Sequence, residues 1–168
     1  MVPGKPDIAR VVLVRNHTAE SYKLARQCEE ELRGSRLGKP VISLMTRPGG
    51  VPPNTEMLAN VLEEGDIVGT ICGDGTFRDI ALSVGDTPVT SLRGGNARDI
   101  GWALHKRPNK TPPSKLIQQS VAISAFALAC TIQGEGLTQR EHAVSYIGCG
   151  ETARASAHLA TDKYRNQQ

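Results

Sequence analysis

The chain has 168 residues, of which 39% are hydrophobic and 22% charged, the balance of a globular protein large enough to bury a core. Its net charge of +3 fits an anionic ligand or a membrane surface. One Trp, three Tyr and two Phe are too few aromatic residues for a nucleic-acid stacking platform, so no nucleic-acid partner is expected. The four cysteines form no Cys-x-x-Cys pair, and no apolar signal segment begins the sequence. We therefore expect a cytoplasmic protein with reduced cysteines.

Short apolar runs alternate with amphipathic stretches along the N-terminal part of the chain. The apolar runs predict strands at Ile8–Val14, Val41–Leu44, Ile67–Ile71 and Pro88–Leu92. The amphipathic stretches predict helices at Ser21–Leu32, Pro53–Leu62, Phe77–Val84 and Ala97–Leu104. This alternation is typical of an α/β fold, an open parallel sheet with helices on both faces. Ligands of such sheets bind beyond the carboxyl ends of the strands, where the Gly-rich and polar loops of this sequence fall.

The Gly-rich turn Cys72-Gly73-Asp74-Gly75-Thr76 lies between a predicted strand and a predicted helix. Such a turn gathers backbone N–H groups at the positive end of the helix dipole, which favours a bound anion. Gly73 and Gly75 allow close backbone approach and positive φ, which a Cβ would penalise, and Thr76 can cap the helix or donate its hydroxyl to a phosphate oxygen. Asp74 inside an anion site indicates phosphate bound together with Mg²⁺. A plain turn between strand and helix is the alternative interpretation.

The pattern changes after a basic, Pro-rich stretch. We expect a nucleotide-binding domain over residues 1–107, a linker over 108–113, and a partial β-rich domain with a terminal helix over 114–168. The charge-free stretch Leu116–Gln133 predicts a buried strand or hairpin, with strand-like alternation over Val121–Ile132. Further expected elements are a turn at Gly134-Glu135-Gly136, a strand at His142–Ile147 and a helix at Thr152–Tyr164. So few strands do not complete a β domain.

Two motifs in this order resemble a known family. Gly73-Asp74-Gly75-Thr76, followed after the next strand by Arg93-Gly94-Gly95-Asn96-Ala97-Arg98-Asp99, is similar to the catalytic domain of diacylglycerol and sphingosine kinases. The resemblance extends from Ile8 to about Leu104. It implies a NAD kinase/diacylglycerol kinase-like fold that transfers the γ-phosphate of ATP, with Mg²⁺, to a lipid hydroxyl. Peripheral contact with a membrane is implied as well.

The resemblance also implies the site residues. It assigns nucleotide binding to Asn16, Thr46, Gly73, Asp74, Gly75, Thr76, Gly94, Gly95 and Asn96. Asp74 is in addition the implied metal ligand and the candidate catalytic base. The sequence departs from the family pattern at Cys72, where the family has Gly, at His17, where Pro usually follows the Asn, and at Gly94, where Thr is common. Asp79 stands where the family usually has a longer acid.

Two other functions stay open on the sequence. A NAD-kinase-like enzyme shares the Gly-Asp-Gly motif, although the loop from Arg93 to Asn96 favours a lipid kinase. A nucleotide-binding module without activity is the other, because the second domain looks incomplete. Arg15 and Arg93, at predicted strand ends, are as readily solvated arginines as partners of phosphate. Exposed strand edges in an incomplete domain also leave a homodimer open.

Overall fold

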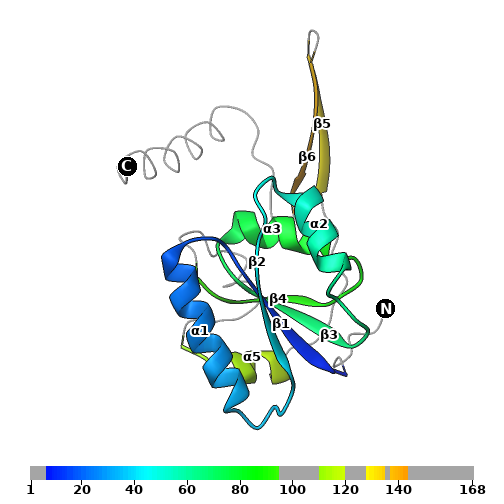
Figure 1. Cartoon of the computed structure of the whole chain (residues 1–168). Helices are drawn as coiled ribbons and strands as arrows, with labels where there is room; N and C mark the ends of the chain where they lie inside the picture. The colour runs from blue at the N-terminus through cyan, green and yellow to red at the C-terminus, as the bar shows by residue number, and fades with distance from the viewer. Residues whose placement is uncertain (1–6, 95–109, 120–127, 135–136, 144–168) are drawn as a thin grey trace. The chain divides into compact units, whose positions relative to one another are not determined.

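The chain divides into two compact units, Met1–Ala125 and Phe126–Gln168. The computed structural model describes residues 7–94, 110–119, 128–134 and 137–143. The first unit contains β1 (Arg10–Arg15), α1 (Ala19–Arg33), β2 (Val41–Met45), α2 (Val51–Ala59), β3 (Asp66–Ile71), α3 (Asp74–Ser83), β4 (Val89–Arg93) and α5 (Pro113–Gln119) (Figure 1). The second unit contains β5 (Leu128–Gly134) and β6 (Leu137–Ala143).

The strands of the first unit form a parallel sheet in the order β2-β1-β3-β4. From β1 the chain crosses outward to β2, and it then returns past β1 to form β3 and β4 on the other side. The direction of progress therefore reverses between β1 and β3, and ligands of open α/β sheets bind beyond the carboxyl ends of the strands at such a switch point. The predicted α/β fold with an open parallel sheet is confirmed.

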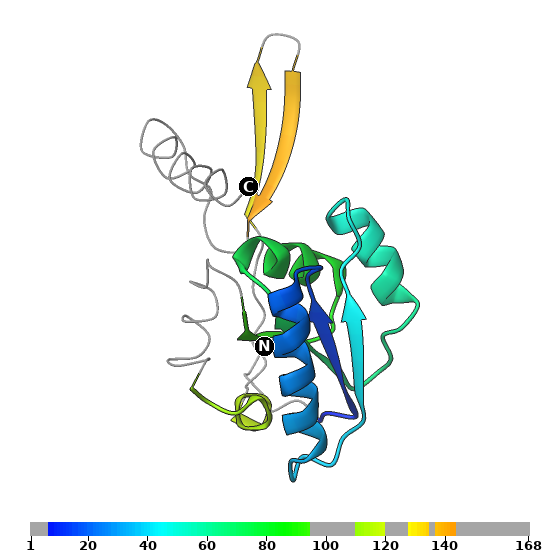
Figure 2. The same ribbon diagram turned by 60° about the vertical axis from the view of Figure 1, so that its left-hand side comes forward.

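Helices cover both faces of this sheet, as predicted. On one face α1 and α5 pack over a hydrophobic cluster, and α5 lies beside α1 in both views of the ribbon (Figures 1 and 2). On the other face α2 and α3 pack over a second cluster. The interior of β1 alternates between the two, because Val11 and Leu13 point to the first cluster and Val12 and Val14 to the second. A strand buried on both faces reads as a continuous apolar run, which explains why it could be predicted.

Gly69, in the middle of β3, leaves room for side chains of the two neighbouring strands, β1 and β4. A Cβ added to Gly69 would lie 2.6 Å from Leu92 Cδ1 and 3.3 Å from Leu13 Cδ2. Since real Cβ atoms do not approach other carbons so closely, the position needs a residue without a side chain. Nothing in the local sequence identifies this requirement, which arises from a neighbouring strand.

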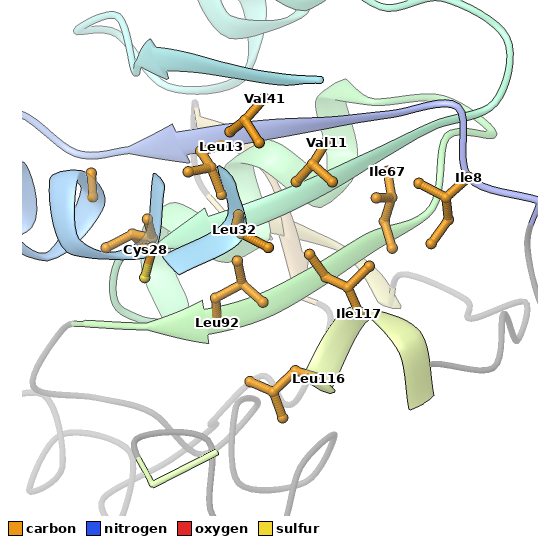
Figure 3. Close-up of a cluster of buried hydrophobic side chains, with 12 residues drawn as sticks. Ile8, Val11, Leu13, Cys28, Leu32, Val41, Ile67, Leu92, Leu116 and Ile117 are labelled. Atoms are coloured by element: carbon orange, nitrogen blue, oxygen red, sulfur yellow. The ribbon is translucent and has the colours of Figure 1, made fainter. Parts of the chain in front are cut away.

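Helix α5 differs from the sequence prediction, which expected a buried strand or hairpin from Leu116 to Gln133. Residues up to Gln119 are helical, and Leu116 and Ile117 lie in the same cluster as Leu32 of α1 and Leu92 of β4 (Figure 3). Their burial was predicted correctly, but a short apolar run does not reveal its period. The segment assigned to the second domain thus begins with a helix that packs in the core of the first unit.

The second unit contains an antiparallel hairpin, in which Gly134 pairs with Leu137 and Leu128 with Ala143. The first strand overlaps the predicted Val121–Ile132, whereas β6 begins five positions before the predicted His142, because the pairing starts directly after residues 135–136. The predicted helices at Ala97–Leu104 and Thr152–Tyr164 lie outside the described residues.

A buried ion pair joins β1 and β3 at the amino edge of the sheet. Arg10 donates from Nε to Asp66 Oδ1 at 2.9 Å and from Nη2 to Asp66 Oδ2 at 2.7 Å, and the Asp66 side chain is only 1% exposed. The N–H of Glu63 donates to Asp66 Oδ2 at 2.9 Å. Burial raises the pKa of Asp66, but the hydrogen bonds from Arg10 and Glu63 outweigh this effect and hold the pKa below its usual value.

We therefore expect the free energy of unfolding to fall on acidification. The stabilisation from Asp66 is fully present above its unfolded pKa of about 3.9, and is lost as the pH falls through the lower folded value. Asp66→Asn leaves Arg10 without its carboxylate partner, so it should lose about 3–5 kcal/mol at pH 7 and show a flatter dependence on pH between about 4 and 2. Urea unfolding across this pH range measures both effects.

Glu63→Gln is the matched control, because the Glu63 side chain is 73% exposed and lies 3.3 Å from Arg10. Its stability and acid dependence should stay within about 0.5 kcal/mol of wild type. An Asp66→Asn chain as stable as the Glu63→Gln chain would contradict the role given to the buried pair.

Candidate functional site

The carboxyl ends of the four parallel strands lie at one edge of the sheet. Arg15, the last residue of β1, pairs with Met45 of β2 and with Ile71 of β3, and Ile71 pairs with Arg93 of β4. Each strand therefore ends at the same level, and the loops that follow begin side by side. The described site residues predicted from the sequence all belong to these loops or to the helix that follows β3: Asn16, Thr46, Gly73, Asp74, Gly75, Thr76 and Gly94. Gly95 and Asn96 lie outside the described residues.

Helix α3 begins at Asp74, three residues earlier than predicted. Its N-cap is Gly73, with φ −84° and ψ 173°, and no described side chain caps the helix. Thr76 lies in the first helical turn, so the prediction that it caps the helix is wrong. Gly73 and Gly75 do not adopt the positive φ that glycine allows, because an extended residue followed directly by helix needs no left-handed step. The N–H groups of a first helical turn have no intrahelical acceptor, and among the described residues no side-chain cap bonds to them here.

Gly75 borders open space in the first turn of α3. It is exposed, and a Cβ built on it would meet no atom of the described residues within 4 Å. The protein's own packing therefore does not require glycine at this position. A residue without a side chain leaves the N–H groups of the turn open to a bound group.

Gly94, after β4, lies directly against the turn that follows β3. It is buried and has φ +98°, and a Cβ on it would lie 3.2 Å from both Cys72 N and Ile71 C. Glycine is needed here for two reasons, its backbone conformation and the close approach of another backbone. Gly94 and the turn after β3 are therefore packed directly against each other.

Cys72, which replaces the leading glycine of the family motif, is 2% exposed. Burial raises the pKa of its thiol to about 12, with further contributions from the carboxylates of Asp74 and Asp79, although a hydrogen bond with Thr70 acts in the opposite direction. A neutral, buried thiol is neither a nucleophile nor a metal ligand. Cys72 therefore serves packing.

Asn16 shapes the loop after β1. Its Oδ1 accepts hydrogen bonds from Thr18 N at 3.1 Å and Thr18 Oγ1 at 2.9 Å, and Thr18 Oγ1 in turn accepts from Ser21 N at 3.2 Å to cap α1. Arg15 donates to the Asn16 carbonyl at 3.0 Å, and its guanidinium lies 5.0 Å from the centre of the Tyr22 ring. The Asn16 side chain therefore fixes the conformation of a loop at the switch point.

Thr46, after β2, is 8% exposed, and its N–H donates to the Arg15 carbonyl at 2.8 Å. Asn54, a buried residue that the sequence prediction missed, holds the rest of this loop. Its Oδ1 accepts from Arg47 N at 2.8 Å, and its Nδ2 donates to the Gly50 carbonyl at 2.6 Å. The sequence did offer a signal for this role, because Asn54 is a polar residue among the apolar positions of a predicted helix.

No protein-family model matches the chain, and no curated protein matches its sequence. The resemblance to lipid kinases rests on the residues quoted for it. Among the helices of the described segments, none combines the length and the apolar character needed to cross a membrane.

The two glycines of the site should respond in opposite ways to the same substitution. Gly94→Ala places a side chain at positive φ against the backbone of Ile71 and Cys72, and should lower the free energy of unfolding by about 1–3 kcal/mol. Gly75→Ala adds a Cβ to open space within a helix, and should be neutral or stabilising by up to about 1 kcal/mol. Urea unfolding of the two variants measures the contrast, and equal losses would contradict the packing described for Gly94.

Proposed function

We propose that this chain binds ATP with Mg²⁺ beyond the carboxyl ends of β1 and β3 and transfers the γ-phosphate to a lipid hydroxyl. The observation that carries the proposal is the N-terminus of α3. It stands at the switch point of the sheet, has no side-chain cap among the described residues, and borders open space at Gly75. Backbone N–H groups and the helix dipole favour the same ligand there, a phosphate group.

The residues present fit a magnesium ion shared with phosphate. Within the described segments, no group of three or more His, Cys, Asp or Glu side chains could hold a metal ion. Mg²⁺ is commonly bound by one or two carboxylates together with substrate phosphates and water, and such a site needs no larger cluster. Asp74, in the first turn of α3, is the proposed carboxylate. When bound, the ion would neutralise charge on the phosphates.

The main contribution of the protein's own residues would be to position the phosphate and the acceptor. Phosphoryl transfer depends on alignment of the acceptor with the phosphate and on stabilisation of spread negative charge. The first turn of α3 would hold phosphate oxygens, and Gly94 lies against the backbone that leads into this turn. The lipid hydroxyl as acceptor is supported by the resemblance of the paired Gly-rich motifs. Asp74 is the proposed base for the hydroxyl proton.

A nucleotide-binding module without transfer is the second candidate. The observation that favours it concerns Asp79, the next carboxylate along α3, whose Oδ1 accepts from Arg78 Nη2 at 2.8 Å. A carboxylate oxygen that accepts from a guanidinium is already engaged in a hydrogen bond, and one that coordinates a metal ion is engaged as well. If Asp74 holds the metal, neither acid is well suited to act as the base.

Calorimetry with Mg²⁺–ATP tests the shared part of both candidates. Wild type should bind, and Asp74→Ala should weaken binding at least about tenfold, because it removes the carboxylate proposed for the metal. Asp86→Ala is the matched control, since Asp86 is an exposed acid that precedes the amino end of β4, and its affinity should equal that of wild type. A folded wild-type chain that does not bind ATP would overturn the proposal.

Transfer from labelled ATP separates the candidates. A labelled lipid product from diacylglycerol or sphingosine vesicles supports the kinase, and labelled NADP, formed when NAD accepts the phosphate, identifies a NAD-kinase-like enzyme. Binding without any labelled acceptor selects the inactive module.

A further inference from the structure

A β-bulge changes the direction of the last side chain of β4. Val89, Thr90 and Ser91 pair in step with β3, but Ile71 pairs with Arg93, so that Leu92 is an extra residue. Regular alternation would put Arg93 on the same face as Ser91. Because of the bulge, Arg93 instead shares the face of its partner Ile71, which is the face covered by α1.

On that face Arg93 forms a two-point ion pair with Glu31 of α1. Nη1 lies 3.0 Å from Oε1, and Nη2 lies 3.2 Å from Oε2. The Arg93 side chain is only 17% exposed, and its buried Nε has no hydrogen-bond partner among the described residues. An arginine in this state depends strongly on its carboxylate, unlike the exposed pair Arg26–Glu30 on the same helix, whose atoms are 3.8 Å apart.

We propose that Arg93 and Glu31 are positioning residues that hold Gly94, directly after β4, against the turn after β3. Arg93 directly precedes Gly94, whose backbone lies against Ile71 and Cys72. The ion pair between Arg93 and Glu31 of α1 therefore restrains the end of β4, and with it the contact of Gly94. Through it the pair also positions the proposed phosphate site, and this second step rests on the proposed function.

Loss of Glu31 would leave a largely buried guanidinium without its counter-charge. Leaving such a group buried is unfavourable, so Arg93 should turn toward solvent and release the end of β4. Gly94 would then separate more often from the backbone of Cys72. Gly94 lies against the backbone N of Cys72, whose side chain is 2% exposed in the packed state, so opening of this backbone contact should raise the accessibility of the thiol.

The test measures alkylation of Cys72 by iodoacetamide in the intact chain, quantified by peptide mass spectrometry. Glu31→Gln should accelerate modification of Cys72 by about tenfold or more, as expected for loss of a charge-assisted pair. Glu30→Gln, the matched control on the same helix, should leave the rate unchanged. The exchanged pair Glu31→Arg with Arg93→Glu should restore slow modification.

Urea unfolding of the same variants is the reference for global stability, because Cys28 belongs to α1 itself and lies within electrostatic reach of both Glu31 and Arg93. If the rise in Cys72 modification only matches the loss of unfolding free energy, Glu31 contributes only general stability and the proposal is overturned. An unchanged Cys72 rate in Glu31→Gln would overturn it as well. Neither result depends on nucleotide binding, so the alkylation experiment tests the proposal even if the chain does not bind ATP.

Where wild type binds Mg²⁺–ATP, affinity gives a second readout with a definite sign. A positioning role predicts that Glu31→Gln weakens binding by roughly threefold to tenfold, with Glu30→Gln unchanged. If Glu31 instead competes with phosphate for Arg93, the same substitution would strengthen binding, and the positioning role would be wrong.

Discussion

The complete burial of β3 is the constraint on which the rest of the first unit depends. All six of its residues are buried, and helices from both faces pack against it. Three features of the molecule follow from this position. At its amino end the buried carboxylate of Asp66 requires Arg10, in its middle Gly69 admits Leu92, and at its carboxyl end the chain must turn at once into α3.

The amino and carboxyl ends of β3 differ in what they contribute to the protein. The amino end is occupied by an ion pair whose partners satisfy each other, so it contributes stability and presents little chemistry. At the carboxyl end the first turn of α3 has no side-chain cap from the part of the chain that the structure describes. Parallel strands bring their loops together at this same end, and the reversal of strand order at β1 and β3 parts the flanking helices there. A binding site can therefore form at the carboxyl end without weakening the buried pair.

Two glycines near the site, Gly94 and Gly75, are glycines for different structural reasons. Gly94 is required by its positive φ and by the backbone beneath it, whereas Gly75 has neither constraint from the protein. A glycine that packing does not require, placed beside open space at a helix N-terminus, is what close approach of a ligand would need. Gly94, which packing does require, keeps the end of β4 against the turn after β3. The proposed phosphate site uses one of each.

The sequence by itself determined the alternation of strands and helices, because a two-sided core imposes continuous apolar runs on β1 and β3 and amphipathic patterns on α1 and α2. It also determined that Asn16, Thr46, Asp74 and Gly94 follow strands, and hence that parallel strands would bring them to one edge. Tertiary structure alone decided the helical state of Pro113–Gln119, the need for glycine at position 69, and the face to which Arg93 turns. These features depend on neighbours far away in the chain, and local periodicity carries no information about them.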